Sequence, residues 1–260
     1  MITIQPLRTK RLCVRFREIT AGAAIRLAGI HPLKHENATT EFLRSIIDSA
    51  ETPTPLHVTD PALWTVQERT LSVCHYLAAM APLGDADFKI GDGRLTDYLL
   101  NNADYIDAVH LGDACDDTWQ MVPMSGMAAE IIETLDGEIQ DVPKGRVHWL
   151  IGSMASQLVR IGKDESPPVD AAGYMEWLKL RMQVFADFPE SDFVELVRLR
   201  AEGAKRLDHL FCMDIGDSGM LAFPSREGAG AELPPARFPV GQCITGVARE
   251  LGGGLPQFDS

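Results

Sequence analysis

Apolar residues recur at intervals of three and four along five segments, the spacing of helices that bury one face. The clearest segment begins at Thr65, where Glu68 stands three residues later. This is the spacing of a capping box, in which each side chain accepts a hydrogen bond from the other residue's backbone amide. Val66 and Val73 then share an apolar face, and Pro82 ends the helix. Four further helices are predicted over residues 128–135, 146–161, 170–185 and 191–207.

Strict alternation of apolar and polar residues predicts strands elsewhere. Residues 11–19 place Leu12, Val14 and Phe16 on one face and basic side chains on the other. Two hairpins are predicted, one joining residues 105–111 to 119–124 and one joining 210–215 to 220–223. The predicted fold class is therefore α+β and mainly helical: a helical core with a small acidic α/β insert and a C-terminal β-hairpin plus extended tail.

The same pattern sets the predicted domain boundaries. Residues 1–84 and 142–207 form the helical core with N-terminal strands, and residues 85–141 form the acidic α+β insert. Residues 208–260 form the β-hairpin and an extended docking tail, which is rich in Gly and Pro and poor in periodic apolar residues. Our hypothesis is that this tail lies along a neighbouring subunit; the alternative is a flexible tail.

Charge is distributed very unevenly along this chain of net charge −13. Residues 85–141 hold 14 acidic and two basic side chains, a net charge of −12. Residues 8–17 form a basic arm with no acid in it. Charge complementarity with protein partners is one interpretation, and a solvated, solubilising surface is the other. The candidate partner-binding residues are Arg8, Lys10, Arg11, Arg15, Arg17, Asp113, Asp116, Asp117, Pro234, Pro235, Arg237 and Phe238.

Several classes of protein are disfavoured by what the sequence lacks. Phosphate would be repelled by the overall charge, so we expect no direct nucleic-acid binding. No apolar run reaches membrane-spanning length and no signal pattern stands at the N-terminus, so we expect no membrane span and synthesis in cytoplasm. The five cysteines are widely spaced and are interpreted as free thiols. No nucleotide-binding or metalloprotease motif is present, and we expect no cofactor.

Gly216-Asp217-Ser218-Gly219 resembles the nucleophile motif of chymotrypsin-like proteases. The following Gly-Pro of that motif is replaced by Met220-Leu221, and the predicted fold is not a pair of β-barrels. A β-turn inside the second hairpin is the better interpretation.

Metal binding has weak candidates. His209 and Cys212 have the spacing of a half-site that Cys243 could complete, but zinc sites usually show two such pairs. Cys74 and His75 are adjacent and point in different directions on a helix. Two acidic sets could hold calcium: Asp113, Asp116 and Asp117, and Asp85, Asp87 and Asp92. Neither set matches a calcium loop, so solvated turns are favoured over calcium sites.

Four stretches of the chain resemble a group of tailed-bacteriophage virion proteins. The first is Thr65-Val66-Gln67-Glu68-Arg69 with the downstream Cys74-His75-Tyr76-Leu77-Ala78, similar to a Thr-x-Gln-Glu-Arg helix in baseplate or tail-tip components. Ile19 to Ile30 with Glu41-Phe42-Leu43 resembles the group's opening segment, and Trp149 to Ala155 its second core helix. Pro234 to Pro239 resembles its tail.

The resemblance implies a non-catalytic structural component of a phage tail or baseplate, of the baseplate-hub or tail-assembly type. Such a protein would be made in the host bacterial cytoplasm, carried in the virion and bound to other tail proteins in an oligomeric assembly. It carries over no catalytic residues. Two alternatives stay open: a cytoplasmic tail-assembly chaperone that is not retained in the virion, and a small-molecule hydrolase using Ser218 or a carboxylate pair.

Overall fold

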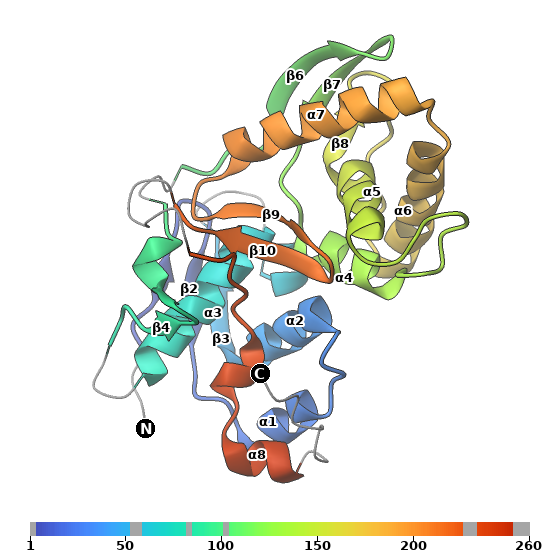
Figure 1. Ribbon diagram of the computed structural model, residues 1–260. Helices are drawn as coiled ribbons and strands as arrows, with labels where there is room; N and C mark the ends of the chain where they lie inside the picture. Colours follow the sequence, from blue (N-terminus) through green and yellow to red (C-terminus); the bar gives the residue numbers. More distant parts are fainter. Residues whose placement is uncertain (1–3, 53–58, 82–84, 101–103, 226–232, 252–260) are drawn as a thin grey trace.

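The computed structural model describes residues 4–52, 59–81, 85–100, 104–225 and 233–251 (Figure 1). Helices and small sheets alternate along the chain. The helices are α1 (Ala21–Ala28), α2 (His35–Ile46), α3 (Val66–Met80), α4 (Gly126–Thr134), α5 (Arg146–Gln157), α6 (Ala171–Ala186), α7 (Glu190–Leu207) and α8 (Gly246–Leu251), with 3-10 turns η1 (Pro61–Leu63), η3 (Leu95–Asp97) and η4 (Val240–Cys243). The strands are β1 (Leu7–Arg8), β2 (Cys13–Phe16), β3 (Ile47–Glu51), β4 (Lys89–Ile90), β5 (Gly93–Arg94), β6 (Val109–Ala114), β7 (Asp117–Met121), β8 (Leu158–Arg160), β9 (Cys212–Gly216) and β10 (Gly219–Phe223).

The predicted fold class is wrong, because the chain is a mixed α/β fold without a clearly helical core. It is 46% helical and 19% strand. Within the described residues the strands form four small sheets, ordered β1-β2-β3, β4-β5, β6-β7-β8 and β9-β10. Strands β3 and β8 follow α2 and α5 without an intervening loop. Their apolar residues continue the helical spacing, so periodicity alone could not separate strand from helix.

The N-terminal sheet confirms the strand predicted from alternation. Strand β2 pairs antiparallel with both β1 and β3. Leu12, Val14 and Phe16 are buried, while Arg15 and Arg17 are exposed on the other face. The basic outer face of this segment is therefore present as predicted.

Residues of the acidic stretch 85–141 share one core with the rest of the chain. The predicted first hairpin is present as β6 and β7, and β7 also pairs with β8, which lies outside the stretch. Helix α4 packs on α2, α5 and α6. Trp119 of β7 is 1% exposed, and its ring lies 6.2 Å from that of Phe185 on α6. Figure 1 shows α7 crossing beneath the β6–β7 hairpin.

The C-terminal segment packs against its own chain over residues 233–251. The predicted hairpin is present as β9 and β10, with Gly216 paired to Gly219 across the turn. Ala222 and Ala236 exchange two backbone hydrogen bonds of 2.9 and 2.8 Å. Farther along, η4 lies on α2 and α3, and α8 lies beside α1 (Figure 1). Residues 252–260 of the predicted docking tail lie outside the described residues.

Candidate functional site

The first turn of α3 connects four parts of the chain through its polar side chains. The predicted capping box is present: Thr65 Oγ1 accepts from the Glu68 amide at 3.2 Å, and Glu68 Oε2 accepts from the Thr65 amide at 2.9 Å. Gln67 and Glu68 lie off the apolar stripe that Val66 and Val73 form. They are nevertheless only 8% and 1% exposed, because other elements cover that face as well.

Glu68 binds the segment that leads into β2. Its Oε1 accepts from Arg11 Nε at 2.9 Å, and its Oε2 also contacts Arg11 Nη2. The Arg11 guanidinium lies over the Tyr105 ring, 4.6 Å from the ring centroid. With 13% of its side chain exposed, Arg11 is mostly buried, unlike the other basic residues of the arm.

Gln67 binds the connection between α7 and β9. Its Oε1 accepts from the backbone amides of His209, Leu210 and Phe211 at 3.1, 3.0 and 3.2 Å. Its Nε2 donates to the Leu207 carbonyl at 3.3 Å. One side chain therefore satisfies consecutive backbone groups of a buried connection, which would otherwise carry a large desolvation cost.

Arg69 binds α2 from the interior. Its Nη2 donates to the Glu36 carbonyl at 2.7 Å and to Thr40 Oγ1 at 2.8 Å, and Nη1 lies 3.3 Å from Glu36 Oε2. A Cβ added to Gly126 would stand 2.3 Å from Arg69 Nη1, so the guanidinium fits against α4 because residue 126 is glycine. The Thr-x-Gln-Glu-Arg pattern is thus used for internal contacts.

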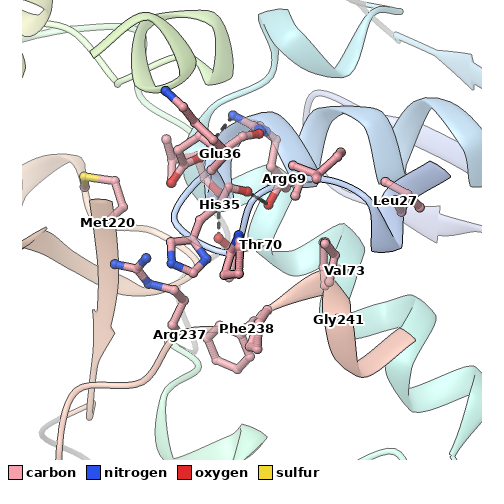
Figure 2. A pocket seen from close by; sticks show the side chains of 18 of the residues that line it. Leu27, His35, Glu36, Arg69, Thr70, Val73, Met220, Arg237, Phe238 and Gly241 are labelled. Atoms are coloured by element: carbon pink, nitrogen blue, oxygen red, sulfur yellow. Dashed lines mark hydrogen bonds and ion pairs between the residues drawn. The ribbon is translucent and has the colours of Figure 1, made fainter. Parts of the chain in front are cut away.

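A pocket of about 290 Å³ lies beside this turn, between α2, α3, the β9–β10 hairpin and residues 236–244 (Figure 2). Three of the four stretches that carry the phage resemblance meet here. Leu27 and Ile30 come from the opening segment, Val66 and Arg69 from the α3 pattern, and residues 236–239 from the C-terminal stretch. Segments far apart in sequence therefore form one site, which makes this pocket the candidate functional site.

The polar end of the pocket is formed by His35 and Arg237, whose side chains lie side by side in Figure 2. Burial and the nearby Arg237 charge lower the pKa of His35 to about 4, so the imidazole is neutral at pH 7. Burial also lowers the pKa of Arg237, against the opposing effect of Glu36 and Glu133. Arg237 Nη1 donates to the Ser218 carbonyl at 2.9 Å.

Glu133 of α4 caps α2 from a distance of almost a hundred residues along the chain. Its Oε1 accepts from the Glu36 amide at 2.9 Å and its Oε2 from the Asn37 amide at 3.2 Å. Lys34 Nζ donates to the Glu133 carbonyl at 3.0 Å. Burial raises the pKa of Glu133 to about 7, although the two amides oppose the shift. This cap explains how α2 begins at His35 although the residue before it, Lys34, makes no side-chain cap.

The structure does not bring the predicted partner-binding residues together in one place. Several are exposed, namely Arg8, Lys10, Arg15, Arg17, Asp113, Asp116, Pro234 and Pro235. Asp117 is 12% exposed and pairs with Lys163. Phe238 is buried, with its ring centroid 5.6 Å from that of Phe211. Arg237 lines the pocket.

Neither Ser218 nor the possible metal ligands form a recognisable catalytic or metal site among the described residues. Ser218 lies in the turn of the second hairpin, as predicted, and no histidine within the described ranges contacts its hydroxyl by a hydrogen bond. His209 is buried against Tyr105, with a centroid distance of 5.8 Å, and its amide binds Gln67. No cluster of three or more potential metal ligands occurs among the residues that the structure describes.

Sequence reasoning missed His35, Glu36 and Glu133 as parts of the site. Their contacts join α2 to α3, α4 and the C-terminal segment, and the local spacing of residues does not predict such long-range pairs. One available signal was the density of charged residues within otherwise apolar helices, since a charge in such a position needs a buried partner.

Comparison with known protein families, with curated proteins and with solved structures finds no match to this chain. In the described part of the chain, no helix combines the length and apolar character needed to cross a membrane.

Proposed function

We propose that this chain is a structural component of a tailed-phage particle, of the baseplate or tail-tip type, that acts by docking onto neighbouring tail proteins. The observation that supports this proposal most is the use of the Thr-x-Gln-Glu-Arg pattern. Gln67, Glu68 and Arg69 each bind a different segment of the chain. The residues that carry the phage resemblance are therefore framework residues, as expected for a scaffold.

The exposed charges supply the docking surfaces in this proposal. Arg8, Arg15 and Arg17 form an exposed basic face beside β2, and Asp113 and Asp116 are exposed at the β6–β7 turn. Opposite charges on neighbouring subunits would steer association and fix its orientation. Assembly into an oligomer in the virion would bury both surfaces.

The test is the copy number of the protein in purified particles. Quantitative mass spectrometry of virions from a phage that encodes this chain should find it at a fixed ratio to the major tail protein. Its absence from particles, with assembly blocked when the gene is deleted, would replace the proposal with the tail-assembly chaperone. A hydrolase activity that is lost in Ser218→Ala would replace it with the enzyme alternative.

A further inference from the structure

The pocket beside α3 has the size and walls of a small-ligand site. Its volume is about 290 Å³, and its apolar wall includes Leu27, Val73, Met220, Phe238, Val240 and Ile244. A dry apolar cavity of about 150 Å³ holds a benzene-sized molecule, so this pocket holds a ligand of about ten heavy atoms. His31 lines the pocket and is exposed, which places an opening to solvent at the turn before α2.

Basic side chains outnumber carboxylates on the pocket wall. Lys34, Arg69 and Arg237 line the pocket with a single carboxylate, Glu36, which is paired with Arg69. Glu133 does not line the pocket, but its charge, like that of Glu36, favours the protonated form of Arg237. An arginine has five N–H donors. Within the described ranges Arg237 makes one hydrogen bond, from Nη1 to the Ser218 carbonyl, and no ion pair. Its remaining donors are therefore available at the polar end of an apolar cavity, next to the neutral His35 ring.

We propose that this pocket binds a small organic carboxylate with an apolar body of about ten heavy atoms. The carboxylate pairs with the free donors of Arg237, and the apolar body extends past His35 toward Phe238 and Val73. A planar guanidinium suits a carboxylate because it offers two parallel N–H donors. This inference goes beyond the docking role and does not rest on it, so either can fail without the other.

The first test compares two ligands that differ in the carboxylate. Octanoate and octan-1-ol share an eight-carbon chain, and both are titrated into the full-length protein by isothermal calorimetry. We expect one octanoate per chain, bound at least tenfold more tightly than octan-1-ol, since hydrogen bonds to charged groups contribute about tenfold to a hundredfold in affinity. Equal binding of the two, or binding of neither, overturns the proposal.

Two variants then place the ligand in this pocket. Arg237→Gln should lose the preference for octanoate while octan-1-ol still binds, which also shows that the variant is folded. Val73 is 1% exposed and lines the cavity, so Val73→Phe fills part of the cavity from the α3 wall. This variant should bind both ligands at least tenfold more weakly.

Arg198→Gln is the matched control, because Arg198 is exposed on α7 and does not line the pocket, and it should bind both ligands as the wild type does. Octanoate affinity unchanged in Arg237→Gln, or unchanged in Val73→Phe, would assign the ligand to another place and overturn the proposal.

Discussion

Glu68 in the first turn of α3 and Arg237 at the polar end of the neighbouring pocket are both charged, but they differ in how completely they are paired. The Glu68 carboxylate accepts from Arg11 Nε and Nη2 and from the amide and hydroxyl of Thr65. In the described part of the chain, Arg237 donates one hydrogen bond, although five N–H groups are available to it.

This difference separates framework from candidate function. A buried charge with all its partners inside the chain stabilises one arrangement of elements and has nothing left to offer a ligand. Arg237 has spare donors beside an apolar cavity, so it can pair with an anionic ligand. The degree of pairing therefore distinguishes Glu68 from Arg237. Arg69 belongs to the same turn as Glu68 and also lines the pocket, and its Nε and Nη1 have no hydrogen-bond partner among the described residues.

The largest effect is expected at Glu68. Glu68→Ala removes the capping box and leaves Arg11 without its ion-pair partner in a mostly buried position. Breaking one partner of a buried pair costs about 3–5 kcal/mol, so the free energy of unfolding in urea should fall by that amount. Glu41→Ala is the control, since Glu41 is 47% exposed and pairs with Arg44; an exposed pair contributes about 0–1 kcal/mol. Equal losses in the two variants would show that the α3 turn is not a framework.

Glu133, which joins α4 to the first turn of α2, should make the stability of the fold depend on pH. Its pKa in the folded protein is about 7, above the ordinary value of 4.5. Between pH 4.5 and 7 the unfolded chain releases the proton while the folded protein retains it, so the wild type loses stability as pH rises. Glu133→Gln keeps an acceptor for the α2 amides and lacks this titration.

The measurement is the difference in unfolding free energy between wild type and Glu133→Gln at several pH values. Relative to Glu133→Gln, the unfolding free energy of the wild type should fall by on the order of 2 kcal/mol from pH 4.5 to 7. Burial also raises the pKa of Asp208 to about 7, but Asp208 is present in both proteins and its contribution cancels. Parallel stability curves across this range would contradict the assignment.

A smaller loss is expected from Gly126→Ala. The added Cβ would stand 2.3 Å from Arg69 Nη1, so the guanidinium must move away from Gly126 and its bonds to α2 would be disturbed. Overpacking a tight contact costs about 1–3 kcal/mol, which outweighs the helix preference of alanine over glycine. Gly241→Ala is the control, because its Cβ would meet no heavy atom within 4 Å. A Gly126→Ala protein as stable as the wild type would show that Arg69 can be repositioned at little cost.

Local signals predicted part of this arrangement and long-range pairing accounts for the rest. The Thr65–Glu68 spacing predicted the capping box, and alternation predicted the buried face of β2, because both depend on neighbouring residues. The Glu133 cap on α2 joins residues almost a hundred positions apart, and Gln67 binds amides more than 140 positions away. Arg11 looked equivalent to Arg15 and Arg17 in sequence, yet its contacts with Glu68 and with the Tyr105 ring keep it mostly buried.

The smallest effect on stability, and the sharpest test of docking, is expected from the exposed part of the basic arm. Arg15→Gln combined with Arg17→Gln should change the free energy of unfolding by no more than about 0.5 kcal/mol, because both side chains are exposed. Arg11→Gln is the contrasting control and should destabilise the fold through Glu68.

If the basic face docks by charge, the double variant should be incorporated less well into particles, and the deficit should shrink as salt weakens wild-type assembly. Incorporation equal to wild type at every salt concentration would remove this face from the docking surface.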